Sequence, residues 1–202
     1  MKIVTMSLKQ ARHKPWLRLS IAAGNMIQLA GLALGGGALL AASSTPSSLV
    51  AILEMCVGWI CIYLCSHAIT HWLIGRWVGI RFRYYTIDST SKPQSWPPGP
   101  LRWLFEHIPF FRLHIDRASL QSVSAGWQAA MWSAGVTASV VVPVLAAFWA
   151  WWAHIPGSLY LFIFTVIWSI GTVINNLRPG GDYFKARQVL TTAKPSVHGK
   201  SD

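Results

Sequence analysis

The sequence predicts an all-α, polytopic membrane protein with four transmembrane helices and a small β-hairpin-like insertion between the second and the third. Hydrophobic residues make up 53% of the 202 residues and charged residues only 11%, which is typical of a membrane protein. Four stretches reach the roughly 20 apolar residues that a bilayer requires, at residues 19–42, 49–75, 129–152 and 159–177. We therefore expect residues 1–202 to form a single integral membrane domain.

Residues 19–42 are expected to remain as a helix and not to be removed as a signal peptide. The stretch is longer than the apolar region of a signal peptide and lacks a convincing cleavage site. It contains five glycines, at positions 24, 31, 35, 36 and 37. Small residues about four apart let transmembrane helices approach closely, so these glycines predict a face that packs against another helix.

Lysine and arginine predict the orientation, because they stay preferentially on the cytoplasmic side of short loops. All 17 lie outside the four stretches, and the loops at 43–48 and 153–158 contain none. We therefore expect both termini in the cytoplasm of a bacterium, with the protein in the inner (cytoplasmic) membrane. The net charge of +11 follows from this topology and favours contact with anionic membrane lipids. The sequence indicates no nucleic-acid-binding fold, so no nucleic acid partner is expected.

Two histidines near the cytoplasmic end of the second stretch are the main candidate site. Residues 67–71 read H-A-I-T-H. Residues four apart project from one face of an α-helix, so His67 and His71 are placed to hold one metal ion. Metal-competent side chains inside a membrane usually face a protein interior or a water-filled cavity. The zinc-protease pattern H-E-x-x-H has a glutamate where this chain has Ala68.

The cytoplasmic segment at 76–128 predicts a pair of strands. Residues 80–87 are β-branched and aromatic with partial alternation, which is typical of a strand. Residues 110–115 form a second extended piece that is able to pair with the first. The insertion is therefore expected to be hairpin-like.

The rest of this segment predicts a loop and two helical pieces. Residues 91–100 contain four prolines and predict a loop. Residues 101–105 predict a short amphipathic piece in the plane of the membrane interface. Asp116 or Ser119 is expected to cap a helix that runs into the third stretch.

A third candidate ligand follows the fourth stretch. Residues 175–181 read N-N-L-R-P-G-G, in which the proline and glycines must break a helix, and Asp182 comes next. A carboxylate here would complete a set of two imidazoles and one carboxylate, which zinc accepts. Asp182 is equally suited to be the N-cap of a helix at 183–193. The sequence leaves both interpretations open.

Taken in order, these segments resemble the site-2 protease family of intramembrane zinc metalloproteases. His67 and His71 match the histidines of the family's H-E-x-x-H helix, and residues 129–135, A-A-M-W-S-A-G, are similar to the segment that leads into its A-G-P-x-x-N motif. Residues 176–179, N-L-R-P, followed by Asp182, are similar to its N-x-x-P…D-G motif. Order and spacing agree over residues 60–190.

The resemblance implies a zinc site and a role for the residues around it. Zinc would be held by His67, His71 and Asp182, and transmembrane substrates would be cleaved near the cytoplasmic face. The residues expected to face a substrate or partner are Asn175, Asn176 and Gly135.

The departures from the family fall on the catalytic chemistry. Ala68 replaces the general base, Val136 and Ser139 replace the proline and asparagine of the middle motif, and Tyr183 stands where glycine is expected. Losing a positioned general base typically costs ~10²–10⁴ in rate. We therefore expect no catalytic residue and a pseudoprotease role, as a binding or accessory subunit of a membrane complex with other transmembrane proteins.

Two alternative functions stay open. One is an active intramembrane zinc metalloprotease with an unusual general base. The other is a pigment-binding membrane subunit, in which His67 or His71 is an axial ligand to a haem or chlorophyll-type cofactor among the 12 tryptophans. A cleavage assay and an absorbance spectrum distinguish these functions from simple binding.

Overall fold

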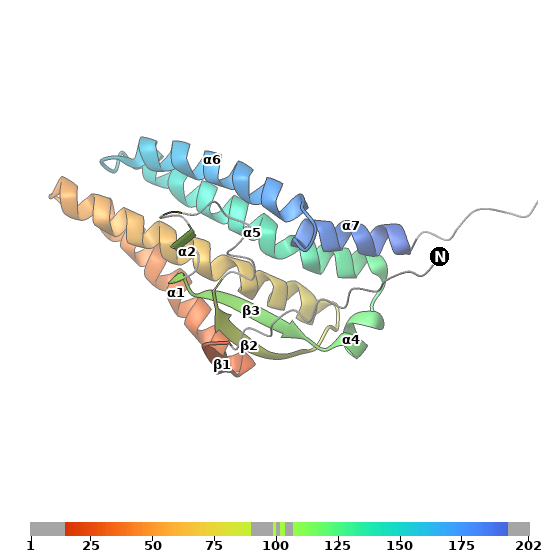
Figure 1. The fold of residues 1–202 in the computed structure, drawn as a ribbon. Coiled ribbons are helices and arrows are strands. Elements are labelled where there is room, and N and C mark those ends of the chain that lie inside the picture. The colour runs from red at the N-terminus through yellow and green to blue at the C-terminus, as the bar shows by residue number, and fades with distance from the viewer. Residues whose placement is uncertain (1–14, 90–98, 100–101, 104–106, 194–202) are drawn as a thin grey trace, which may run out of the picture.

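Four long helices form the body of the protein (Figure 1). The computed structural model describes residues 15–89, 99, 102–103 and 107–193. The four helices are each long and apolar enough to cross a membrane, which confirms that prediction: α1 (Ile21–Ala42), α2 (Ser48–Trp77), α5 (Ala125–Trp152) and α6 (Ser158–Leu177). Each of them packs mainly on its neighbours in the order α1-α2-α5-α6.

The two central helices are longer than the bilayer needs. Helix α2 has 30 residues and is about 45 Å long at 1.5 Å per residue, against a hydrocarbon core of about 30 Å. Helix α5 has 28 residues and begins four residues before the predicted stretch. Helix α7 (Asp182–Thr192) follows α6 and packs against α5. The extra turns of the central helices lie toward the sheet and α7, where the candidate site is found (Figure 1).

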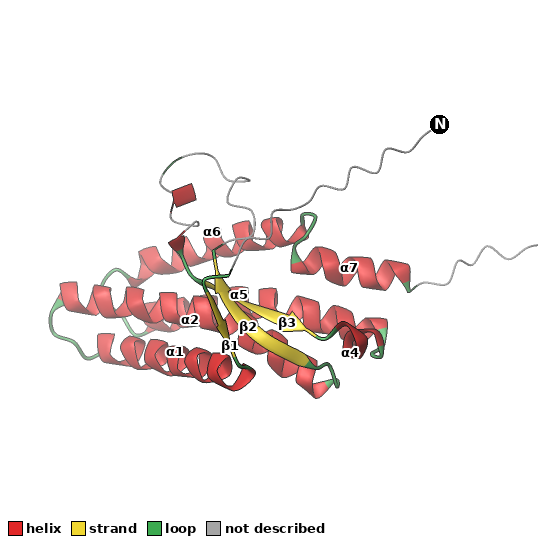
Figure 2. Cartoon of the chain, turned by 60° about the horizontal axis from the view of Figure 1, so that its bottom comes forward, coloured by secondary structure: helices red, strands yellow, loops and turns green. Residues whose placement is uncertain are grey.

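A three-stranded antiparallel sheet lies against the helices (Figure 2). Strands β2 (Phe82–Asp88) and β3 (Phe110–Ile115) confirm the predicted pair, but β1 (Leu17–Leu19) joins β2 on its other edge. The first helix therefore begins at Ile21, two residues after the start of the expected stretch, because Leu19 pairs with Tyr85. Three residues are too few to show the two-residue period of a strand in a sequence.

Tyr85 anchors the sheet to α1. A side chain at Gly24 would overlap the Tyr85 ring, so the glycine lets the strand approach the helix. The Tyr85 hydroxyl donates a hydrogen bond to Oδ1 of Asn25 at 2.7 Å. Burial raises the pKa of Tyr85 to about 12, so this hydroxyl stays protonated and remains a donor at physiological pH.

The predicted helix running into the third span is not continuous. Helix α4 (Arg117–Gln121) is a separate short helix that ends before α5 begins. Asp116 stands at its N-cap position without a side-chain capping bond, and its carboxylate instead pairs with Arg83 at 2.9 Å. Ser119 accepts a hydrogen bond from the Arg81 backbone N–H at 2.8 Å, which ties α4 to the strand. The carboxylate of Asp116 is therefore used by the sheet and not by the helix.

Two further predictions concern the segment before β3. The proline-rich loop at 91–100 lies outside the described residues except for Gly99. The amphipathic piece at 101–105 also lies outside them except for Arg102 and Trp103.

Glycines on one face of α1 let this helix pack closely on α2. This confirms the predicted packing face for some of the five glycines. A Cβ atom at Gly35 would lie 2.8 Å from the carbonyl oxygen of Gly58, and one at Gly31 would overlap the Cys65 sulfur. At Gly36 and Gly37 a Cβ atom meets nothing within 4 Å. The packing face therefore includes Gly31 and Gly35 but excludes the next two glycines.

We expect Gly35→Ala to lower the stability of the protein and Gly36→Ala to leave it unchanged. The added methyl group at position 35 meets backbone of α2, and overpacking of this kind costs about 1–3 kcal/mol. At position 36 the same methyl group meets open space. Thermal unfolding of the two purified variants in one detergent measures the difference. Equal melting temperatures would contradict the helix contact described above.

Candidate metal centre

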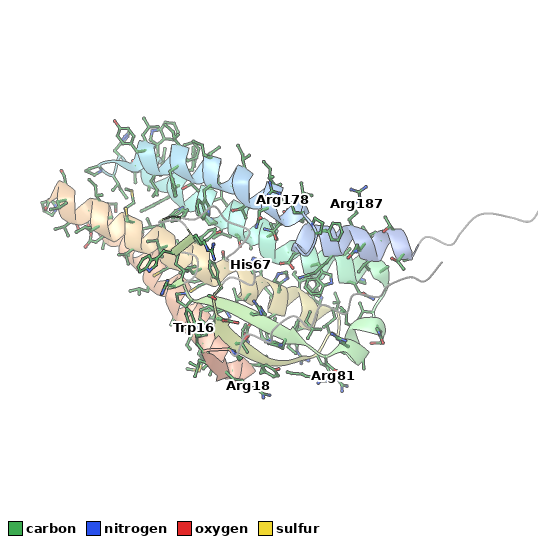
Figure 3. All side chains as sticks on the ribbon, in the orientation of Figure 1. Trp16, Arg18, His67, Arg81, Arg178 and Arg187 are labelled. Carbon is green, nitrogen blue, oxygen red and sulfur yellow. The ribbon has the colours of Figure 1, made fainter. Side chains whose placement is uncertain are left out.

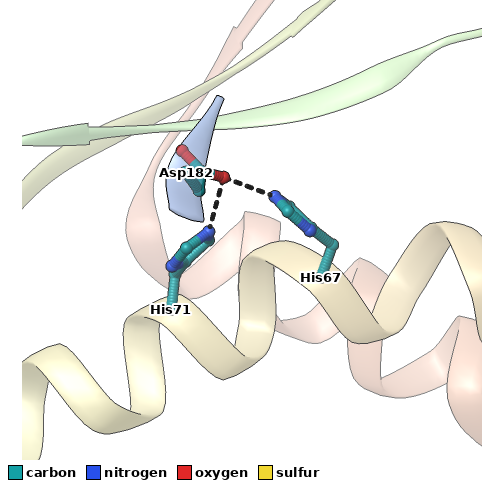
Figure 4. A group of neighbouring side chains, drawn as sticks. All are labelled: His67, His71 and Asp182. Atoms are coloured by element: carbon teal, nitrogen blue, oxygen red, sulfur yellow. Dashed lines mark hydrogen bonds and ion pairs between the residues drawn. The ribbon is translucent and has the colours of Figure 1, made fainter. Parts of the chain in front are cut away.

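Two predicted ligands on one helix and a third from a distant part of the sequence meet at one point (Figure 4). His67 and His71 lie on successive turns of α2, and Asp182 reaches them from the start of α7. Oδ2 of Asp182 lies 3.4 Å from Nε2 of His67 and 3.2 Å from Nε2 of His71. One ligand atom from each residue falls within 4.8 Å of the others. The structure thus brings together a group that could hold a metal ion.

The approach of α5 to α2 depends on Gly135. Any side chain at this position would overlap the imidazole of His71. Gly135 was expected to face a substrate or partner, but it packs against His71 and is not among the residues lining the adjoining cavity. It serves the site by leaving room for the histidine ring.

Helix α5 also fixes the orientation of both imidazoles. Nδ1 of His71 lies 2.7 Å from the Met131 carbonyl oxygen, and Nδ1 of His67 lies 3.0 Å from Oγ of Ser139. The Ser139 hydroxyl donates its hydrogen to the Gly135 carbonyl at 3.0 Å, so it is free to accept from His67. Residues 131, 135 and 139 are four apart and therefore form one face of α5. The residues of this face have the same four-residue spacing as the histidine pair of the antiparallel helix α2, and they contact that pair.

These hydrogen bonds determine the tautomers. A carbonyl oxygen only accepts, so Nδ1 of His71 carries a hydrogen, and the same follows for Nδ1 of His67. In the neutral imidazoles both Nε2 atoms then direct lone pairs toward the Asp182 carboxylate. Three acceptors that face one another repel unless a cation lies between them, either an added proton or a metal ion. Outer partners that hold the far nitrogen of a histidine in this way are typical of metal ligands.

A sharp break in the chain positions Asp182. Gly180 has a φ of 94°, and Gly181 packs so closely on the Asn176 carbonyl that a side chain there would overlap it. Gly181 occupies the N-cap position, so α7 begins at Asp182 and not at residue 183. The interpretation of Asp182 as the N-cap is therefore wrong. Its carboxylate is left to face the histidines.

Neighbouring side chains stabilise the ionised form of the Asp182 carboxylate. Oδ1 accepts a hydrogen bond from the Lys185 ammonium at 2.7 Å, while Oδ2 faces the histidines. Burial acts to raise the pKa of Asp182. Hydrogen bonds that its carboxylate accepts from His67 and His71 when an added proton occupies Nε2, together with the Lys185 charge, outweigh burial and hold the pKa well below its usual range. Asp182 is therefore ionised and available as a ligand.

A cavity of about 660 Å³ opens beside the three residues. Its walls come from α2, β2, β3 and α5, and from the end of α6, the start of α7 and the chain between them. Ala68 lines it where the protease pattern has glutamate, and Asp182 is the only carboxylate among the described lining residues. Asn175 and Asn176, which were expected to face a partner, both line it. The Asn176 side chain also accepts a hydrogen bond from the Asp182 backbone N–H at 3.3 Å.

Three contributors to the site were not predicted as such. The sequence indicates Ser139 only as a departure from the motif that it resembles, although a spacing of four from Gly135 places both residues on the same helix face. Lys185 lies three residues after Asp182 on α7, a spacing that brings side chains together on a helix. The Met131 carbonyl gave no signal, because a backbone group is present at every residue.

Comparisons with protein-family models, curated proteins and solved structures find no match for this chain. Two imidazole nitrogens and one carboxylate oxygen form a donor set that suits zinc and leave a fourth position open. The Nδ1–H tautomers and the ionised carboxylate are compatible with a divalent metal ion.

We expect Ser139→Ala to weaken divalent metal binding about 10- to 100-fold, because loss of an outer hydrogen bond to a ligating histidine has effects of this size. Ser133→Ala is the matched control, since Ser133 lies on the same helix and lines a separate groove. Competition with a zinc-binding dye measures both affinities. Equal affinities would show that the bond from His67 to Ser139 does not orient a ligand.

Proposed function

We propose that this protein is a catalytically degenerate relative of the site-2 proteases, which keeps a zinc-holding core and acts as a binding or accessory subunit of a membrane protein assembly. The observation that carries the proposal is the combination of an ordered set of metal ligands with alanine at the position of the general base. The three candidate ligands favour a retained metal centre, and the alanine at the position of the general base argues against turnover.

The family relationship is supported by the way three separated motifs surround one site. The histidine pair comes from α2 and Gly135 from α5, and Asp182 is the first residue of α7. The motifs were matched by order and spacing alone, and such matches in unrelated helices would have no reason to converge. This convergence supports a common core, with zinc held by His67, His71 and Asp182.

The loss of catalysis is supported by the composition of the cavity. When bound, zinc would supply Lewis acidity, but hydrolysis also needs a group that accepts a proton. The Ala68 methyl group cannot do this, and Asp182 is committed to the histidines and Lys185. Glu54 is hydrogen-bonded to Thr45 near the opposite end of α2, and Asp116 is paired with Arg83. No other carboxylate of the described chain lines the cavity.

The proposal includes an orientation with both termini in the cytoplasm of a bacterium. Its support is the distribution of charge. Arg18, Arg81, Arg178 and Arg187 all lie away from the tips of the two helical hairpins (Figure 3). A basic side of this kind is expected to face the cytoplasm and contact anionic lipids.

A binding role is supported by an open groove between α2 and α5. Its volume is about 400 Å³, and its α5 wall consists of small or β-branched residues that include Ala130, Ala134 and Ala138. Alanines four apart let a second transmembrane helix approach closely. A membrane protein partner is therefore a better fit than a soluble one.

Elemental analysis tests the metal centre. We expect about one zinc per purified chain, and less than about 0.1 in His71→Ala and Asp182→Ala, because a three-ligand site holds its ion and a two-ligand site does not. His154→Asn is the control, since His154 lies in the turn after α5 and asparagine tolerates its positive φ of 57°. Wild-type protein without zinc would refute the zinc proposal.

Gentle purification from native membranes tests the function. We expect other transmembrane proteins in stoichiometric amounts, no visible absorption band from the isolated chain, and no cleavage of a transmembrane peptide. Cleavage that disappears in His67→Ala would instead establish an active protease, and a visible band lost in His67→Ala or His71→Ala would establish a pigment-binding subunit. Recovery of the chain alone would argue against an accessory subunit.

A further inference from the structure

The cavity beside the histidines is strongly cationic. Among the described residues, its lining contains the charged side chains of Arg112, Arg178 and Lys185 against the single carboxylate of Asp182. Lys185 already neutralises one oxygen of that carboxylate at 2.7 Å. Within the described part of the chain, neither Arg112 nor Arg178 forms an ion pair. A divalent ion on the same ligands would make the excess of positive charge larger.

The small side chain of Ala68 also leaves more space in this cationic cavity. A glutamate at this position would place a carboxylate in the cavity wall, where it would offset the cations and occupy part of the volume. Alanine does neither, and its side chain leaves the wall apolar. Alanine at position 68 therefore leaves the cavity roomier and more positive than a glutamate at the same position would.

Lys185 is well placed to bind an incoming anion. Its ammonium group lies 4.4 Å from the centre of the Trp132 ring, which restricts its position. One of its three hydrogens is used on Asp182, so two remain for another acceptor. The ammonium thus stands at the edge of the metal ligands, with donors available to the cavity.

We propose that this cavity is a receptor for a carboxylate group carried by a peptide segment, and that the carboxylate completes the metal site. The inference rests on the proposed zinc centre. A carboxylate oxygen is an ordinary zinc ligand and suits the position that three protein ligands leave open. Lys185 and Arg178 supply charge-assisted hydrogen bonds to its second oxygen.

A peptide is favoured over a small carboxylate by the size and walls of the cavity. About 660 Å³ exceeds the space that one carboxylate group needs. Phe82, Phe111 and Trp132 provide apolar walls for the atoms that flank such a group. A glutamate or aspartate side chain of a partner protein satisfies both the charged and the apolar parts.

The test uses the full-length protein in detergent, loaded with cobalt(II) in place of zinc, because cobalt has a visible spectrum that responds to a change of ligand. The probes are acetyl-Ala-Glu-Ala-amide, the matching glutamine peptide, acetate and inorganic phosphate. We expect the glutamate peptide to change the spectrum and the glutamine peptide to have no effect. Tighter binding of the glutamate peptide than of acetate supports a polypeptide source, and equal binding refutes the peptide receptor, because a small carboxylate then binds as well.

Variants connect the response to the cavity. We expect Lys185→Gln and Arg178→Gln each to weaken peptide binding about tenfold, and Lys185→Arg to restore it in part, because charge-assisted hydrogen bonds have effects of this size. Arg187→Gln is the matched control, since it removes the same charge from a residue of α7 outside the cavity lining (Figure 3). Its affinity should equal that of the wild type.

The outcomes separate this proposal from the metal centre on which it rests. A wild-type protein without a cobalt spectrum refutes the metal centre and, with it, the carboxylate receptor. A normal cobalt spectrum with equal responses to the glutamate and glutamine peptides refutes the receptor alone. Tighter binding of phosphate than of either carboxylate probe also refutes it, and so does an unchanged affinity in Lys185→Gln and Arg178→Gln.

Discussion

The contact between Gly135 of α5 and the His71 ring of α2 is the constraint on which the rest of the site depends. It lets two antiparallel helices approach until backbone and side-chain groups of one reach the imidazoles of the other. Met131 and Ser139 stand one turn to either side of Gly135, so the spacing of α5 repeats the spacing of the histidines. The absence of a side chain at Gly135 thus aligns the histidine pair and the hydrogen bonds to its Nδ1 atoms.

The second half of the site comes from a break in the chain. Helix α6 must end for Asp182 to turn back toward α2, and the glycines at 180 and 181 make that turn possible. The carboxylate is then shared between the histidines and Lys185. A lysine that neutralises this carboxylate would be costly in an enzyme that needs a negative base nearby, but it is compatible with the proposed site for a metal ion and an anion.

Much of this arrangement could be predicted from the sequence, and the failures have physical causes. The histidine pair is recognisable because four-residue spacing is a local property of a helix, and Asp182 because proline and glycine end the preceding one. The interpretation of Asp182 as the N-cap is wrong because the preceding residue, Gly181, occupies the N-cap position of α7. Strand β1 was missed because its three residues depend on β2, which lies more than 60 residues away, for their structure. The hydrogen bond from His71 to the Met131 carbonyl depends on helix register, which composition does not encode.

The pairing of β1 with β2 has a consequence for how the chain enters the membrane. Strand β1 leads directly into α1, and β2 follows α2, so the two strands flank the first helical hairpin. They can meet only if both ends of that hairpin emerge on the same face of the bilayer. A chain in which one of these helices failed to insert would leave β1 and β2 separated by the membrane, with Tyr85 cut off from Asn25. The pairing of β1 with β2 therefore requires the correct membrane topology. It forms only when both α1 and α2 have inserted.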